Sequence, residues 1–438
     1  MFLGRKRKFL FISVLFSVTG FFYGCAFDDT MMTGTAEKKS YLTLNESGTF
    51  RIMQLTDLHL TSNGTLIHDW QTLRWIEETV TEYRPDIVEL TGDAVAGPAA
   101  QRNKALLALA NLFEKHEIDW AYTFGNHDGE HAADGTWAGK EGKQHDLLKY
   151  CPAAADTINK NKVKTVFYGD NATQNLEIFN LLKGYKHSLL RRSDAETADT
   201  DAMGVGNYVI EVKDKSGKTV FTLFHMDSHG KIYVDPVGNK KGPDGYADVG
   251  YAGLTEAQIR WYRETVKPYS DSRIPGALFM HVPHFAYRSA VETQTGLSEY
   301  GVPQFKEREN LAAYLKANRM IPDAFADYGF VKQEDIYGPR WDDGLEAAMT
   351  DWPSTNLVST GHDHNNCFVI RRQKNADAPP VLLAYGRTTG VNAWGRDVPI
   401  GATIFEVTPS KYDPAQPEAM YRIRQVYPSF PYIRLGTR

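Results

Sequence analysis

Five short motifs in this sequence carry side chains of the types that bind metal ions. They are Asp57-Leu58-His59, Gly92-Asp93, Gly125-Asn126-His127-Asp128, Met280-His281 and Gly361-His362-Asp363-His364. Each motif follows a short apolar run of the kind that forms a buried strand. Imidazole and carboxylate ligands together suit Zn, Mn or Fe, and ions of this kind can activate water. The motifs therefore predict a metal site capable of hydrolysis.

No single motif is specific, but the order of all five is informative. With 13 histidines in 438 residues, a His-x-His is expected by chance about 0.4 times. The ordered set Asp-x-His, Gly-Asp, Gly-Asn-His-Asp, a strand-end histidine and Gly-His-x-His resembles the calcineurin-like metallophosphoesterases from about residue 50 to residue 410. The segment Gly-His-Asp-His-Asn-Asn, followed by Leu-Ala-Tyr-Gly, most resembles the purple-acid-phosphatase-like branch of that superfamily.

The resemblance implies a role for each motif residue. One metal ion would be held by Asp57, His59 and His364, the other by Asn126, His281 and His362, with Asp93 bridging the two. A hydroxide held between the ions would attack phosphorus in line. His127 would stabilise the phosphoryl oxygens or protonate the leaving group, and Asp128 would orient it.

One position departs from the purple acid phosphatases. They carry a tyrosine three residues after the bridging aspartate, and its bond to ferric iron gives their colour. This chain has Ala96 there. We therefore expect two divalent ions, Mn, Zn or ferrous iron, and no ferric-tyrosinate centre.

Four further polar residues leave two interpretations open. His225 and His229 either contact the substrate or are ordinary loop residues. His284 either supports the ligands or lies in a surface turn after a proline. Arg387 either reaches a substrate phosphate or is solvated or salt-bridged.

The elements that must position these residues follow from hydrophobic periodicity. We expect strands at 50–56, 86–92 and 118–124 with helices at 69–83 and 101–116 between them, a βαβαβ opening. Later strands are expected at 206–213, 219–226, 276–282, 356–360, 367–372, 381–385 and 401–407, and a helix capped by Thr255 at 255–267. Ligands bind at the carboxyl ends of strands in such sheets, so the motifs should converge. The resemblance implies an α/β fold, a metallophosphoesterase-type sandwich of two mixed β-sheets flanked by helices.

The N-terminus is predicted to be a targeting segment. Four basic residues at 5–8 precede an apolar run of fifteen residues, 9–23, shorter than the roughly 20 that span a bilayer. Residues 1–24 are therefore predicted to be a signal peptide for export to the cell envelope, with a signal anchor as the alternative. Gly24-Cys25 resembles a bacterial lipoprotein box, so Cys25 is either lipidated or lost by ordinary cleavage nearby. A polar linker at 25–48 and a single catalytic domain at 49–438, beginning near Phe50, would follow, with long connections at 129–200 and 284–355.

Composition excludes several classes of protein. Hydrophobic residues make up 42% and charged residues 24% of the chain, as in a folded globular protein and unlike a multi-span membrane protein. The net charge is −5, and it becomes −9 when the four basic residues of the signal are removed. No nucleic-acid partner is therefore expected, and membrane contact is expected only through a lipid at Cys25. Cys151 and Cys367 are too few for a disulfide framework and are either two thiols or one pair.

These observations predict a dinuclear-metal-dependent hydrolase of phosphoesters, with a phosphomonoesterase as the first hypothesis. A phosphodiesterase acting on nucleotides or lipid headgroups is the alternative within enzymes. A surface lipoprotein that binds metal without turnover is the alternative of another class. Intact His127 and Asp128 argue against the last, because a degenerate site would be free to lose residues that do not bind metal.

Overall fold

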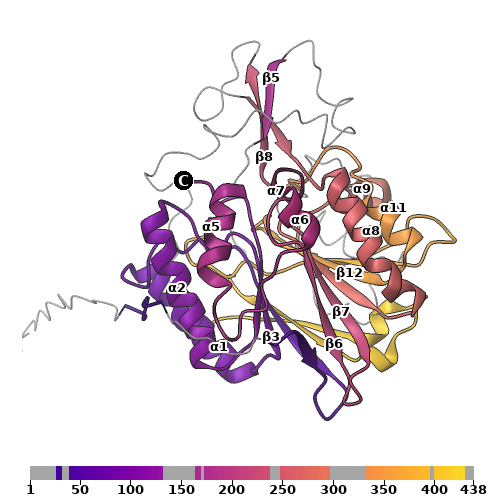
Figure 1. Ribbon diagram of the computed structural model, residues 1–438, viewed down its shortest axis with the longest axis horizontal. Helices are drawn as coiled ribbons and strands as arrows, with labels where there is room; N and C mark the ends of the chain where they lie inside the picture. The colour runs from indigo at the N-terminus through magenta and orange to yellow at the C-terminus, as the bar shows by residue number, and fades with distance from the viewer. Residues whose placement is uncertain are drawn as a thin grey trace, which may run out of the picture.

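Two mixed β-sheets pack face to face with helices on their outer sides (Figure 1). The computed structural model describes residues 26–31, 39–131, 163–168, 172–236, 247–295, 331–332, 334–394 and 399–429. The predicted signal peptide, Cys25 and Cys151 lie outside these residues, whereas Cys367 is buried. The arrangement confirms the predicted class of fold.

The first sheet has five strands in the order β17-β16-β2-β3-β4. Its strands are β2 (Phe50–Leu55), β3 (Ile87–Thr91), β4 (Trp120–Thr123), β16 (Ala402–Val407) and β17 (Tyr421–Val426). The pairs β2–β3 and β3–β4 are parallel, because α1 (Ile67–Tyr83) and α2 (Ala99–Lys115) make the crossovers. The predicted βαβαβ opening is confirmed, and β17 is an addition to the predicted strands.

The second sheet has seven strands in the order β1-β6-β7-β10-β12-β15-β14. Its strands are β1 (Tyr41–Thr43), β6 (Tyr208–Lys213), β7 (Thr219–His225), β10 (Gly276–Phe279), β12 (Thr355–Thr360), β14 (Val369–Arg372) and β15 (Val381–Tyr385). Aromatic side chains join the two sheets: the rings of Phe279 and Phe405 lie 6.3 Å apart, and those of Phe50 and Phe221 lie 5.2 Å apart. This packed interior fixes the strand ends relative to one another.

Helices cover both outer faces. Figure 1 shows α1 and α2 on the side of the five-stranded sheet, and α8 (Glu256–Asp271), α9 (Phe285–Thr295) and α11 (Leu345–Asp351) on the side of the seven-stranded sheet. The predicted cap of α8 is present, since the Thr255 side chain accepts from the Gln258 N–H and Gln258 bonds back to the Thr255 N–H. Between β5 and β6 the described residues form three further helices: α5 (Ala172–Leu182), α6 (Asp194–Ala198) and α7 (Thr200–Met203).

A small antiparallel sheet projects beyond the sandwich (Figure 1). It consists of β5 (Val163–Tyr168), β8 (Lys231–Pro236) and β9 (Ala247–Tyr251), and a separate pair is formed by β11 (Val331–Lys332) and β13 (Asn366–Cys367). Sequence periodicity did not indicate these strands, apart from the region of β13. Short strands interrupted by glycine and proline give too few alternations to be recognised.

The chain joins the fold earlier than the prediction near Phe50. Strand β1 pairs in parallel with β6, and the Phe27 N–H donates to the Asn63 carbonyl at 2.8 Å. Three residues are too few for a periodic signal, so the strand depends on its partner. The segment predicted as a linker is therefore partly built into the body.

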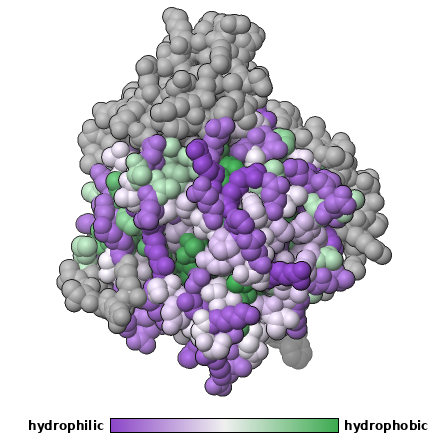
Figure 2. Space-filling view, turned by 45° about the vertical axis from the view of Figure 1, so that its right-hand side comes forward, coloured by the Kyte–Doolittle hydropathy of each residue, from purple (hydrophilic) through white to green (hydrophobic). Residues whose placement is uncertain are grey.

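The face shown in Figure 2 is largely hydrophilic, with hydrophobic residues in small separate patches. Among the helices that the structure describes, none combines the length and apolar character needed to cross a bilayer.

Candidate metal centre

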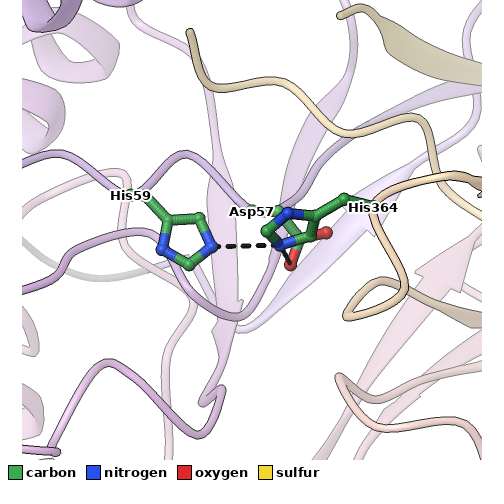
Figure 3. Close-up of side chains that lie close together, drawn as sticks. All are labelled: Asp57, His59 and His364. Carbon is green, nitrogen blue, oxygen red and sulfur yellow. Dashed lines mark hydrogen bonds and ion pairs between the residues drawn. The ribbon is translucent and has the colours of Figure 1, made fainter. Parts of the chain in front are cut away.

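The loops that follow β2, β3, β4, β10 and β12 meet at one place. They bring together two groups of side chains, and within each group the candidate ligand atoms lie within 4.8 Å of one another. The first group is Asp57, His59 and His364, and the second is Asp93, His281 and His362. Figure 3 shows the first group, with both imidazoles directed at the same point as the Asp57 carboxylate. The predicted convergence of the strand ends is confirmed.

Asp93 lies between the two groups. Its Oδ2 is 3.1 Å from His281 Nε2 in its own group and 3.8 Å from His59 Nε2 in the other. Its Oδ1 accepts the His127 N–H at 2.8 Å. Asn126, one residue before His127, is buried on the same loop. A carboxylate in this place can bridge two ions.

The rings of His281 and His364 are held so that Nε2 of each faces the other candidate ligands. His281 Nδ1 donates to the Thr91 carbonyl at 2.8 Å, and His364 Nδ1 donates to the Trp394 carbonyl at 2.5 Å. A bond of this kind fixes the tautomer and leaves the other nitrogen as the ligand atom. His364 Nε2 lies 3.4 Å from Asp57 Oδ1 and 3.2 Å from His59 Nε2.

The backbone of the site is strained at several of the candidate ligands. Of the eight non-glycine residues with positive φ in the described part of the chain, four are predicted ligands: Asp57, His59, Asp93 and His362. A non-glycine residue in this region costs on the order of 1–3 kcal/mol and persists only where its surroundings enforce it. Such a concentration indicates that ligand placement is maintained against local backbone preference.

Gly92 explains why a glycine precedes the bridging aspartate. Its φ is +85°, and a Cβ atom built on it would lie 2.5 Å from Nδ1 of His281. A side chain there would displace the imidazole, so the close approach of β3 and β10 requires glycine.

The pKa values of the candidate ligands bear on whether they can bind metal cations. Burial lowers the pKa of His59 to about 3, although Asp93 opposes this shift. Burial raises the pKa of Asp57, but the adjacent His364 outweighs it and brings the pKa to about 2. Neutral imidazole and ionised carboxylate are the forms that bind metal. Burial lowers the pKa of His281, but Asp93 outweighs it and raises the pKa to about 10, so a metal ion bound there must displace a proton. The donor types of both groups suit divalent ions.

His127 stands at the edge of the first group, with its ring 5.2 Å from that of His59. Its Nδ1 donates to Glu130 Oε2 at 2.5 Å. Burial lowers the pKa of His127, but Asp93 and Glu130 outweigh it and raise the pKa to about 9. The imidazole is thus a cation near neutral pH and can donate a proton.

The prediction that Asp128 orients His127 is wrong. Asp128 Oδ2 accepts the N–H groups of Asp93 and Gly125 at 3.0 and 2.7 Å, and Oδ1 accepts that of Val95 at 3.1 Å. With both oxygens used in this way, Asp128 joins the loops after β3 and β4. Glu130 holds His127 instead. The sequence analysis did not identify Glu130. The only indication in the sequence was that Glu130 lies three residues after His127, a spacing that lets two side chains meet within one turn.

The remaining candidates are structural. His225 is fully buried and bonds to Glu89 at 2.8 Å, and His229 bonds to Gln258 at 2.8 Å. His284 is buried and accepts the Ala286 N–H, so it lies in no surface turn. Arg387 is neither exposed nor placed for a phosphate, because it is buried and donates to the His364 carbonyl.

Comparison with known proteins agrees with this geometry. The model of the calcineurin-like phosphoesterase family matches residues 50–253. The probable inactive purple acid phosphatase 28 of Arabidopsis thaliana is 24% identical over 81% of this chain and 74% of its own length. The phosphatase DCR2 of Saccharomyces cerevisiae is 23% identical over 78% of this chain and 48% of its own length.

Among solved structures, a dimetal phosphatase from Danio rerio aligns over 86% of this chain and 98% of its own, with 11% identity and a TM-score of 0.40. The family match covers the loops after β2, β3 and β4, which carry Asp57, His59, Asp93 and His127. Residues 50–253 therefore match the calcineurin-like phosphoesterase family, in agreement with the resemblance of the motifs.

Proposed function

We propose that this protein is an active phosphoester hydrolase that uses two divalent metal ions and acts on phosphomonoesters. The observation that carries the proposal is the position of Asp93, within 3.8 Å of a histidine in each of two ligand groups and bonded to the backbone of His127. A metal-storing or structural site would need the two groups but would have no use for a cationic histidine at their edge.

The division of work among the side chains follows from the geometry. When bound, two such ions neutralise phosphoryl oxygens and lower the pKa of water so that it can act as a nucleophile at neutral pH. The groups around Asp57 and Asp93 would hold them. His127, with Nδ1 bonded to Glu130, presents Nε2 to the substrate and donates to a phosphoryl or leaving oxygen. Asp128 keeps the two loops in register without touching the substrate.

Two plant relatives bear the word inactive in their names, so activity is the first thing to measure. The metal-loaded protein should be assayed with p-nitrophenyl phosphate and with bis(p-nitrophenyl) phosphate, with Mn²⁺ and Zn²⁺ supplied separately. Faster turnover of the monoester is expected. Faster turnover of the diester would identify a phosphodiesterase, and two bound ions without turnover of either ester would identify a non-catalytic metal-binding protein.

We also propose that the protein is exported and carries a lipid on Cys25. The segment just after Cys25 is bonded to the body: Asn111 Nδ2 donates to the carbonyls of Asp28 and Thr30 at 2.8 and 2.9 Å. A lipid at Cys25 would thus hold the catalytic body near the bilayer, and residues 26–31 would not act as a free tether.

A further inference from the structure

A pocket of about 430 Å³ opens beside the second ligand group. Its lining includes His362, Tyr251, Trp394, Lys231, Arg288 and Arg340. The ring of Tyr251 packs edge-on against that of His362, with centroids 4.4 Å apart, and the ring of Trp394 lies 4.8 Å from that of His364. The pocket therefore adjoins both ligand groups and has room for the part of a substrate beyond the scissile phosphate.

Three cationic side chains from separate segments converge on this pocket. Lys231 begins β8, Arg288 belongs to α9, and Arg340 lies in the loop before α11. Lys231 Nζ lies 5.6 Å from the centre of the Tyr251 ring, and Arg288 is buried with Nη2 donating to the Ile336 carbonyl at 2.5 Å. Arg288 is thus held by the interior, whereas Lys231 is half-buried and Arg340 is exposed.

The pocket's two carboxylates are directed at donors of the protein itself. Glu334 Oε1 accepts the Asn365 N–H at 2.5 Å, and Asp363 Oδ2 accepts the Tyr385 hydroxyl at 2.6 Å. These bonds hold the loop that carries His362 and His364. Three cations thus line the pocket against two carboxylates, and the formal excess of positive charge favours an anion in the open space.

We propose that this pocket binds a second phosphate group, so that the substrate is a small molecule with two phosphates, of which one is removed and the other is held. The inference rests on the proposed phosphomonoesterase function and names its substrate class. In the reaction the oxygen of water bonds to phosphorus, the ester P–O bond breaks, and the leaving oxygen takes a proton. Inorganic phosphate and a product that keeps its second phosphate result.

The test compares substrates that differ by the second phosphate alone. The pairs are fructose 1,6-bisphosphate with fructose 1-phosphate, adenosine 3′,5′-bisphosphate with adenosine 3′-monophosphate, and inositol 1,4-bisphosphate with inositol 1-phosphate. The preferred pair distinguishes a sugar, a nucleoside or a lipid headgroup as the source. The kcat/KM for the bisphosphate should exceed that for the monophosphate by about tenfold or more, because a charge-assisted contact of this kind is worth at least that factor.

Substitution then assigns the preference to the pocket. Lys231→Met combined with Arg340→Met should reduce the ratio of the two kcat/KM values by about tenfold or more, a ratio in which a general loss of activity cancels. Lys218→Met, in the exposed turn between β6 and β7, is the matched control and should keep the ratio. Equal kcat/KM values within every pair, or an unchanged ratio in the double variant, would overturn the proposal while leaving the phosphatase function intact.

A second measurement needs no turnover. Calorimetric titration of the EDTA-treated protein with inorganic pyrophosphate should show binding that the double variant weakens by about tenfold or more and Lys218→Met leaves unchanged. If p-nitrophenyl phosphate is not hydrolysed at all, the proposed function fails, and this titration alone decides the pocket. Equal dissociation constants in the wild type and the double variant would then overturn it.

Discussion

Asp93 is the residue on which the two ligand groups depend. Its Oδ2 faces His281 at 3.1 Å and His59 at 3.8 Å. Three hydrogen bonds hold the residue in place: its N–H donates to Asp128, its Oδ1 accepts the His127 N–H, and its carbonyl accepts the His59 N–H. A bridging carboxylate is shared, so its removal should affect both ions. The positive φ of 50° at Asp93 shows that the loop is bent to place this carboxylate.

We predict that Asp93→Ala lowers metal occupancy at both positions, measured as ions per chain by elemental analysis after dialysis. The exposed Asp271, which pairs with Lys267 on α8, provides the control substitution Asp271→Ala and should keep both ions. Two ions per chain in Asp93→Ala would show that the carboxylate is not shared.

His127 and Glu130 form a pair whose effect should depend on the leaving group. His127→Ala should keep its metal ions and lose about 10² to 10⁴ in turnover if the imidazole protonates the leaving oxygen. The loss should shrink for p-nitrophenyl phosphate, whose leaving group needs no proton, and should be largest for alkyl phosphates. Glu130→Gln should give a smaller loss with the same dependence, because it loosens the imidazole without removing it.

The matched measurement is a series of aryl and alkyl phosphates for both variants. An equal loss across the series would assign His127 to stabilising charge on the phosphoryl oxygens. If the loss in Glu130→Gln depends on the leaving group differently from the loss in His127→Ala, Glu130 does not act through His127.

At the scale of elements, the site depends on loops that are bonded to one another rather than on any one strand. Asp128 accepts N–H groups from the loops after β3 and β4, and Asp57 accepts the His362 N–H with both oxygens at 3.1 Å, which joins the loops after β2 and β12. Each carboxylate thus accepts hydrogen bonds from buried backbone N–H groups that lie beyond the strand ends and are out of reach of water.

We predict that Asp128→Asn destabilises the protein by about 1–3 kcal/mol, because the amide nitrogen cannot accept and leaves buried N–H groups unsatisfied. Metal affinity should fall with it, since the same bonds position Asp93. Urea unfolding and metal titration measure the two effects. Full stability with a loss of turnover alone would restore the catalytic role that the sequence suggested for Asp128.

At the scale of the whole molecule, stability should respond to pH through a histidine outside the reaction. Burial lowers the pKa of His284 to about 3, and its Nδ1 accepts the Ala286 N–H at the start of α9. In the unfolded chain the pKa returns to about 6.5, so below that pH the unfolded state binds a proton that the folded state excludes. The stability contributed by neutral His284 is therefore complete above pH 6.5 and is lost as the pH falls towards 3.

We expect the wild type to lose about 1 kcal/mol more unfolding free energy than His284→Asn between pH 7.5 and pH 5.5. Asparagine is a good helix cap that does not titrate, so the variant isolates the proton. Denaturant unfolding at saturating metal checks this. Parallel pH dependence in the two proteins would contradict it.

The place of the molecule in the cell gives a further prediction. Cys25→Ser should release the protein from the membrane fraction or leave its signal uncleaved, because lipidation needs the thiol. Fractionation and N-terminal sequencing of the mature protein measure this. A soluble mature form that begins after residue 25 would refute the lipid anchor and leave export intact.

The sequence by itself determined the ligand residues that meet at the site and the layers that carry them. Asp57, His59 and Asp93 follow neighbouring parallel strands of the five-stranded sheet, so their strand ends must lie together. The same holds for His281, His362 and His364 in the seven-stranded sheet, and the packing of the two sheets brings the two sets to one site. The strands and helices of residues 50–124 and the cap at Thr255 were also predictable, because periodicity and capping are local signals.

Only the tertiary structure decided which side chains bond to one another and which residues line the pocket. Asp128 follows His127 directly and looked like its partner, but the strand ends place backbone N–H groups around Asp128 and turn Glu130 towards the imidazole. The pocket cations Lys231, Arg288 and Arg340 are separated by up to about a hundred residues and share no motif. Hydrogen bonds and charge act through space over a few ångström, and sequence spacing reports such distances only within one element, so contacts between elements had to await the fold.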